Sequence, residues 1–375
     1  MTAVAGPPAA AATGSGRSRP GREILRTAAS VVLIAAIFAF AVPHFASYRS
    51  VWASMAAMTW AQALLVAAAA AISMASTWIM IWSVLPSIRL REAAVVNLGS
   101  NAVANTLPAG GALAMGVSWA MLSSWGVSTA EYVLYTLVSG IWNVFARLGL
   151  PVLALLVLVT VSRPGGGLIA AAAAGLALLA ATAAGLGLLM RSESFAVRAG
   201  RALRPALAFA CRVARRPPPA DIPGSLLGFR HRAGTLIAAR GWSITAATAA
   251  SNLALWLVLL ACLRGIGLSQ AQVSWQTSLA AFAFVRLLTV LPITPGGLGI
   301  TELGLIAILA GGGHRDGAQV TAAVLLYRAV TYLPPIPLGA IACLTWRHAP
   351  ALIHAKPAGL PQGDGDGKRP AGLDR

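Results

Sequence analysis

Charged side chains are scarce in this sequence, and acidic ones are the scarcest. Only 10% of the 375 residues are charged, and 28 Lys and Arg outnumber 10 Asp and Glu. Soluble globular domains carry about 25% charged residues. Hydrophobic residues make up 58% of the chain, which is more apolar surface than a soluble core of this length can bury. The composition therefore excludes a soluble globular protein and indicates an integral membrane protein.

Residues that would catalyse a reaction or hold a metal are also few and scattered. The three cysteines, Cys211, Cys262 and Cys343, lack the close spacing of zinc or redox motifs, and the five histidines have no cysteine or carboxylate at ligand spacing. No Walker-type phosphate loop is present, which argues against ATP-driven pumping by this chain alone. We therefore expect no enzyme activity, no metal and no cofactor.

Apolar runs of about 20 residues predict an all-α polytopic membrane protein. Its transmembrane domain covers 23–350, between tails at 1–22 and 351–375 whose composition is typical of disorder. The first apolar run is too long for a signal peptide, so we expect it to be a retained span. Full spans are expected at about 24–42, 60–85, 130–161, 168–190, 241–263 and 318–346, with Pro151 kinking or dividing the third.

The distribution of arginine predicts the orientation in a cytoplasmic membrane. Residues 191–240 form a basic segment with ten arginines against Glu193 and Asp221. Lys and Arg are retained on the cytoplasmic side, so we place this loop, the basic N-terminus and the C-terminal tail in the cytoplasm.

Two apolar stretches are interrupted by proline and glycine, one in each half of the chain. The first reads Asn105-Thr-Leu-Pro-Ala-Gly-Gly-Ala, and the second reads Thr289-Val-Leu-Pro-Ile-Thr-Pro-Gly-Gly-Leu-Gly. Their shared pattern indicates a weak internal repeat. We expect two broken re-entrant helical hairpins, related as an inverted repeat and meeting near the middle of the bilayer. Charge counting does not distinguish six spans plus two hairpins from ten spans.

The second interrupted stretch is the stronger candidate for a binding site. Backbone N–H and C=O groups cannot stay unpaired against lipid tails, and proline and glycine interrupt the helix that would pair them. The interruption at Pro295, Gly296, Gly297 and Gly299 therefore indicates a polar cavity at membrane depth. A helix that begins after these glycines would favour an anion, for which a lipid phosphate is the obvious candidate. Alternatively, the glycines only let two helices approach closely.

Three ionisable residues lie in apolar surroundings near this stretch. Glu302 follows the glycines, and its expected partner is Arg286 or Arg328. Either arginine could instead bind a lipid phosphate through paired donors. The alternatives are an ion pair that only fixes helix packing, and an Arg328 side chain that extends to the membrane surface.

The first half offers secondary candidates. Asn143 and Arg147 are four residues apart and share one helix face. The first interrupted stretch adds four further candidates, Asn105, Pro108, Gly110 and Gly111. We expect the Asn105 side chain to cap a helix.

Three motifs follow one another along the chain: Asn105-Thr-Leu-Pro-Ala-Gly-Gly, Leu291-Pro-Ile-Thr-Pro-Gly-Gly-Leu-Gly-Ile-Thr-Glu and Leu326-Tyr-Arg-Ala-Val-Thr-Tyr-Leu-Pro. In this order they resemble the recurring motifs of a known family, the lysylphosphatidylglycerol synthase transmembrane or flippase-like domain. The resemblance implies a lipid flippase-like protein that translocates or binds a phospholipid or aminoacyl-phospholipid headgroup. The chain ends in a short polar tail, so we expect no synthase activity. Many family members carry a charged pair after the first Leu-Pro, and Ala112 to Gly116 lacks it.

Membrane lipids, anionic or aminoacylated, are the expected partners, with a homo-oligomer or a lipid-modifying enzyme as further partners and no nucleic acid. Two other functions remain open. A secondary transporter of a small anion would use the same broken-helix arrangement. A membrane scaffold for a lipid-modifying glycosyltransferase would use the basic segment 191–240.

Overall fold

The computed structural model describes residues 48–106, 110–159, 166–192, 194, 198, 201, 222–289, 299–310 and 317–348. Every secondary-structure element in this part of the chain is an α-helix. The predicted all-α class is therefore confirmed. The predicted first span at 24–42 and both predicted tails lie outside the described residues.

Long apolar helices form most of the predicted spans. Helix α4 covers Trp60–Val84, α7 covers Thr129–Val159 and α8 covers Gly166–Arg191. The predicted ranges 60–85, 130–161 and 168–190 match these helices, and Pro151 lies inside α7 without dividing it. Four ranges of the described residues are long and apolar enough to cross a membrane: Trp60–Val84, Thr129–Leu158, Gly228–Gly265 and Gly317–Trp346. The chain is a multi-pass membrane protein by this criterion.

Each interrupted stretch joins two short helices. In the first half, α5 (Leu90–Thr106) and α6 (Gly110–Ser124) pack on each other, and in the second half α11 (Trp275–Leu288) packs on α12 (Ile300–Ala310). Crossing the hydrocarbon layer takes about 20 helical residues, and none of these helices has that length. Two hairpins of short helices are thus present, while their re-entry on one side of the membrane stays a prediction.

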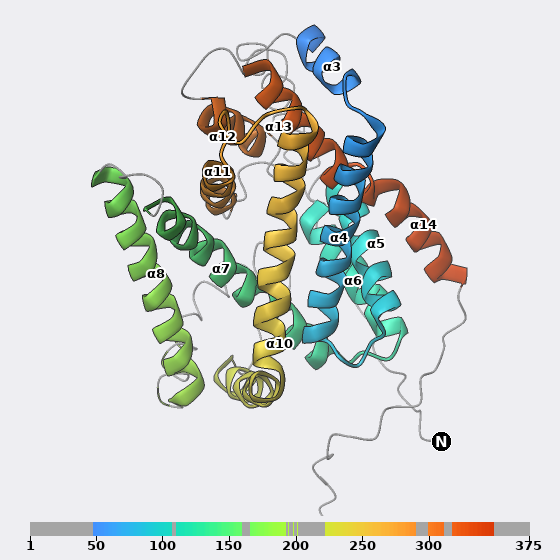
Figure 1. Cartoon of the computed structure of the whole chain (residues 1–375). Coiled ribbons are helices and arrows are strands. Elements are labelled where there is room, and N and C mark those ends of the chain that lie inside the picture. Colours follow the sequence, from blue (N-terminus) through green and yellow to red (C-terminus); the bar gives the residue numbers. More distant parts are fainter. Residues whose placement is uncertain are drawn as a thin grey trace, which may run out of the picture.

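The range 318–346, predicted as one span, is two helices. Helix α13 ends at Tyr332 and α14 begins at Pro335. Pro334 and Pro335 have no backbone N–H to continue the helix, and proline is favoured at a first helical position. Figure 1 shows α14 as the helix that follows α13 after this break.

The segment 191–240, predicted as a loop, is helical in its last part. Helix α10 runs from Ile222 to Gly265, well before the predicted start at 241. Arginine and alanine are good helix formers, and the arginines do not interrupt this helix. Apolar residues recur at helical spacing, and Phe229, Ala233, Leu236, Ile237 and Ile244 pack with Val84 of α4 and Val138 of α7. In Figure 1 the first part of α10 lies at an angle to the rest of that helix.

The contacts between helices join the two halves of the chain, while the predicted internal repeat stays a prediction. Each half contains a long apolar helix, a hairpin of short helices and a further apolar segment, and the two long helices, α4 and α10, lie side by side (Figure 1). The hairpins exchange partners, because α5 packs on α14 of the second half while α11 packs on α7 of the first half. Reciprocal packing of this kind is expected of two related halves. The inverted orientation of the halves stays a prediction.

Large apolar side chains cover the outside of the helices. Trp60 is 92% exposed, Leu64 71% and Ile72 61%, all on α4. Contiguous apolar surface of this kind is rare on soluble monomers and is expected on a surface that faces lipid. The interior beneath it consists of residues such as Leu259, Phe282 and Ile306 from α10, α11 and α12.

Gly339 sets how closely α14 approaches α5. A Cβ atom at this position would collide with the carbonyl oxygen of Leu98 and the side chain of Ala102. We predict that Gly339→Ala lowers the unfolding free energy by about 2 kcal/mol, because the backbone must shift. Thermal unfolding in detergent, followed by tryptophan fluorescence, measures the change.

The matched control is Gly116→Ala on α6, where a Cβ atom meets nothing within 4 Å. Alanine is a better helix former than glycine by about 1 kcal/mol, so this variant should be as stable as the original chain or more stable. Equal stability of the two variants would contradict the close packing of α5 and α14.

Candidate functional site

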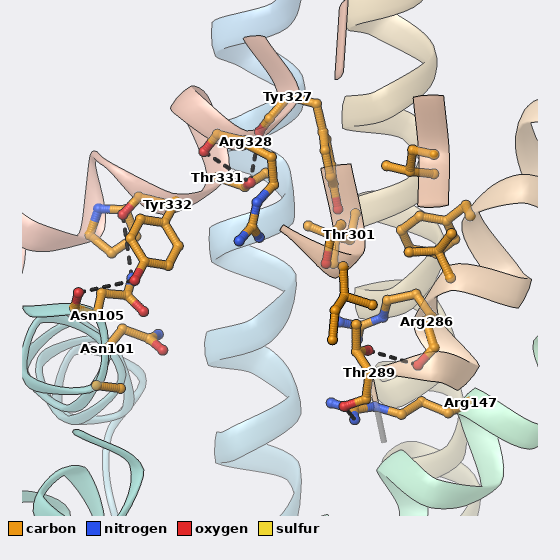
Figure 2. Close-up of a pocket in the computed structure, with 17 residues that line it drawn as sticks. Asn101, Asn105, Arg147, Arg286, Thr289, Thr301, Tyr327, Arg328, Thr331 and Tyr332 are labelled. Atoms are coloured by element: carbon orange, nitrogen blue, oxygen red, sulfur yellow. Dashed lines mark hydrogen bonds between the residues drawn. The ribbon is translucent and has the colours of Figure 1, made fainter. Parts of the chain in front are cut away.

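A polar cavity of about 520 Å³ lies where the two hairpins meet α7, α10 and α13. Three arginines line it, Arg147, Arg286 and Arg328, together with neutral polar residues from both halves of the chain. The neutral polar residues are Asn101, Asn105, Thr289, Thr301, Tyr327, Thr331 and Tyr332. Figure 2 shows Arg147, Arg286 and Thr289 on one side, Asn101, Asn105 and Tyr332 on the other, and Arg328 between them.

The cavity lies deep along the long helices. Arg147 is 12 residues before the end of α7 at Val159, which corresponds to about 18 Å along the helix axis. The lining residue Leu255 lies on α10, ten residues before its end at Gly265, or about 15 Å. Half of a hydrocarbon layer is about 15 Å thick. These positions place the cavity near the middle of the apolar part of both helices, where ionisable residues are expensive.

Glu302 pairs with Arg328, as one of the two sequence alternatives predicts. Arg328 Nε donates to Glu302 Oε1 at 2.6 Å, and the carboxylate side chain is only 1% exposed. The other carboxylate oxygen accepts a hydrogen bond from the Gly299 N–H at 2.6 Å. Glu302 is the third residue of α12, and its carboxylate caps this helix by accepting a hydrogen bond from Gly299, the residue before the helix. Gly299 has φ of +84°, a conformation that favours glycine.

This geometry changes the prediction for the start of α12. The sequence suggests that an external anion binds the free N–H groups there. In the structure the chain's own carboxylate occupies the Gly299 N–H. Arg328 also lines the cavity, and its guanidinium carbon lies 5.2 Å from the centre of the Tyr332 ring.

Arg286 has no carboxylate partner among the described residues. Its Nη2 donates to Asn252 Oδ1 at 3.1 Å, and its guanidinium carbon lies 5.9 Å from the Phe282 ring. Its Nε is buried and has no hydrogen-bond partner in the described part of the chain. Arg286 is partly buried, and a guanidinium held by a neutral amide keeps its positive charge uncompensated by any carboxylate of the described residues.

Arg147 is the second arginine without a carboxylate partner in the described ranges. Its Nη1 donates to the Thr289 carbonyl at 3.4 Å, a long bond, and its Nε is buried without a partner there. Thr289 ends α11, three residues after Arg286, so this bond brings Arg147 of the first half to the second hairpin. The positive charges of Arg147 and Arg286 repel each other, and Arg286 and Arg328 do the same.

Asn105 connects the first hairpin to α13. Its Nδ2 donates to the Tyr332 carbonyl at 3.3 Å, and the Tyr332 hydroxyl donates to the Asn105 carbonyl at 3.0 Å. These reciprocal bonds differ from the capping predicted for Asn105, because they join two helices that are 227 residues apart in the sequence. They fix one wall of the cavity.

The other secondary candidates lie away from the cavity lining. Asn143 Nδ2 donates to the Ser139 carbonyl within α7, and Gly110 packs so closely on α5 that a Cβ atom would collide with the Ala104 carbonyl. A Cβ atom at Gly111 would meet nothing within 4 Å. The close-approach interpretation of the glycines therefore fits Gly110. Pro108, Pro295, Gly296 and Gly297 lie outside the described residues.

Sequence reasoning missed several lining residues and one supporting residue. Asn252 is 4% exposed and holds Arg286, and its signal in the sequence is a lone amide in the middle of the apolar run of α10. Asn101 is a helix-capping candidate beside the first interrupted stretch, and Thr289, Thr301 and Thr331 stand in the quoted motifs, but no local pattern assigns any of them to a cavity. Only the packing of the helices brings them to one cavity.

The cavity is suited to binding an anion. Three guanidinium groups and the single carboxylate of Glu302 give a formal charge of +2. No group of three or more histidine, cysteine or acidic side chains that could hold a metal occurs in the described residues. Guanidinium groups bind phosphate or carboxylate oxygens with paired N–H donors.

The protein is therefore an all-helical, multi-pass membrane protein with a basic cavity between two hairpins of short helices. The family model described as the lysylphosphatidylglycerol synthase TM region matches residues 27–339. The chain belongs to this family, as the sequence motifs indicate. A comparison with curated proteins gives no match.

The Glu302–Arg328 pair should be required for stability as well as for the shape of the cavity. We predict that Glu302→Gln lowers the unfolding free energy by about 3 kcal/mol, because Arg328 loses its carboxylate. Thermal unfolding in detergent measures the loss.

The double variant Glu302→Gln/Arg328→Gln serves as the control, since it removes both charges of the pair. Removing both is expected to be less harmful than removing one, so the double variant should be more stable than Glu302→Gln alone. If Glu302→Gln unfolds at the temperature of the original chain, the ion pair contributes nothing to stability and this description of the site is wrong.

Proposed function

We propose that the chain binds the phosphate of a phospholipid headgroup in this cavity and translocates the lipid across the membrane. The observation that carries the proposal is the pair of partly buried arginines, Arg147 and Arg286, which line the cavity and lack a carboxylate partner in the described ranges. An uncompensated charge at membrane depth is unfavourable unless a ligand of opposite charge offsets it.

The position of the cavity favours a lipid over a molecule from water. The surrounding helices expose large apolar side chains that suit contact with acyl chains. In the proposed mechanism the headgroup moves through the polar cavity while the acyl chains stay in the lipid. The arginines replace the hydration of the phosphate, which lowers the barrier that the hydrocarbon layer opposes to a charged headgroup.

The proposed activity involves no covalent step. The role of the protein is to provide donors for the phosphate and to let the two hairpins shift between arrangements that open to opposite sides. The proposed orientation places both termini in the cytoplasm. Arg230 Nη2 donates to the Arg191 carbonyl at 3.2 Å, which brings the basic end of α8 next to the basic first part of α10. Because arginine is retained on the cytoplasmic side, this contact supports placing both segments at the cytoplasmic surface.

Transfer of acyl-labelled fluorescent phosphatidylglycerol in reconstituted vesicles tests the proposal. A membrane-impermeant reductant bleaches the outer leaflet, so the later loss of fluorescence reports lipid moved from the inner leaflet. We predict that Arg147→Gln/Arg286→Gln slows transfer by at least about tenfold, because hydrogen bonds to charged groups contribute about 1.5–3 kcal/mol each.

The matched control is Arg240→Gln on α10, which removes an arginine that packs over the Trp82 ring outside the cavity lining. This variant should transfer lipid at the rate of the original chain. A folded double variant with an unchanged rate would refute the proposal. Uptake of inorganic phosphate without lipid transfer would instead identify a transporter of a small soluble anion.

A further inference from the structure

Carboxylates are the side chains that would accept the ammonium group of an aminoacylated or ethanolamine lipid, and they are rare in this structure. In the described ranges the carboxylates are Glu92, Glu131 and Glu302. Glu302 is held by Arg328 and by the Gly299 N–H. Any ammonium group in the cavity would therefore compete with Arg328 for the same carboxylate.

The other two carboxylates lie far from the cavity. Glu92 is in the first turn of α5, 13 residues before Asn105, or about 20 Å along the axis. Glu131 is in the first turn of α7, 16 residues before Arg147, or about 24 Å. Residues 107–109 and 290–298, which join the helices of the two hairpins, contain no Asp or Glu.

Aromatic rings are the alternative acceptors for an ammonium group, and the arginines already lie against the rings of the lining. Arg286 lies 5.9 Å from the centre of the Phe282 ring and Arg328 lies 5.2 Å from that of Tyr332. A cation on these faces would meet the like charge of the guanidinium group as well. Among the described residues, the cavity thus offers an ammonium group repulsion by the arginines and no carboxylate other than Glu302, which Arg328 already binds.

The neutral side of the cavity has groups that suit hydroxyls. Asn101, Asn105, Thr331 and Tyr332 lie opposite Arg147 and Arg286 (Figure 2). Amide and hydroxyl side chains both donate and accept hydrogen bonds, which matches glycerol or another polyol. The volume of about 520 Å³ is within the range of small-ligand sites, about 300–1,000 Å³.

We infer that the cavity selects anionic phospholipids whose headgroup carries neutral hydroxyl groups beyond the phosphate, and that it rejects headgroups with an ammonium group. The inference rests on the proposed function, because it assigns the substrate class of the same site. The arginines hold the phosphate, and the asparagine and hydroxyl side chains hold the polyol.

Parallel transfer measurements test the selectivity. Phosphatidylcholine vesicles contain a trace of one acyl-labelled lipid: phosphatidylglycerol, phosphatidylethanolamine or lysylphosphatidylglycerol. The original chain should move phosphatidylglycerol at least about tenfold faster than either lipid with an ammonium group, which corresponds to one unfavourable charge interaction. Protein-free vesicles give the passive rate.

Asn101→Asp adds a carboxylate to the cavity without changing the shape of the side chain. This variant should transfer phosphatidylglycerol about tenfold more slowly than the original chain. The ratio of its transfer rates for phosphatidylglycerol and lysylphosphatidylglycerol should shrink or reverse. Asn97→Asp, one helical turn earlier on α5 and outside the lining, is the matched control and should keep the original preference. Gel filtration confirms that each variant is folded, and the measurement on the original chain stands even if Asn101→Asp does not fold.

The outcomes separate the two proposals. Transfer of lysylphosphatidylglycerol as fast as phosphatidylglycerol by the original chain would overturn the selectivity while leaving lipid translocation in place. No transfer of any lipid above the passive rate would remove the proposed function itself. An unchanged preference in a folded Asn101→Asp variant would overturn the assignment of this cavity as the selective site.

Discussion

The uncompensated positive charge of Arg147 and Arg286 is the constraint on which the site depends. Both guanidinium groups have neutral oxygen partners, the Thr289 carbonyl and the Asn252 amide, and both leave a buried Nε without a partner among the described residues. Bringing such charges into a membrane domain costs several kcal/mol. A bound anion would offset this cost, and the Glu302 carboxylate, already paired with Arg328, does not reach them by any bond in the described ranges.

The broken hairpins are what make such a cavity possible. An uninterrupted helix satisfies its own backbone and presents only side chains, whereas a helix that ends at membrane depth needs other groups to pair its terminal N–H groups. At the start of α12 the Glu302 carboxylate fulfils this need for Gly299. The bonds between Asn105 and Tyr332 join the first hairpin to α13, and the Arg147 bond joins α7 to the second hairpin. Both halves of the chain are therefore required to form one site.

The sequence predicts the class of the fold and the residues with charge, because both follow from composition and local pattern. Apolar runs give α4, α7 and α8 with accurate bounds, and lone charges in apolar surroundings point to Arg286, Glu302 and Arg328. The break between α13 and α14 was missed because hydropathy stays high across it, although the two prolines mark it. The arginines before residue 241 indicate a loop, whereas α10 already begins at Ile222, because arginine is compatible with a helix.

Neutral lining residues are beyond this kind of reasoning, for a physical reason. Thr289 and Asn101 stand at the edges of the interrupted stretches, but their side chains are common, and their place in the cavity arises from which helices meet. The sequence also does not decide which arginine pairs with Glu302, because both Arg286 and Arg328 lie in apolar surroundings near it. Both α11 and α13 pack on α12, and in the structure Arg328 of α13 makes the bond to Glu302 while Arg286 of α11 bonds to Asn252.

The most direct test of the central claim is native mass spectrometry of the protein with the lipids that it retains through purification. If Arg147 and Arg286 hold a phosphate, the original chain carries bound phospholipid, and a folded Arg147→Gln/Arg286→Gln variant has lost it. Equal retention of phospholipid by the two proteins, or none by either, would contradict the account.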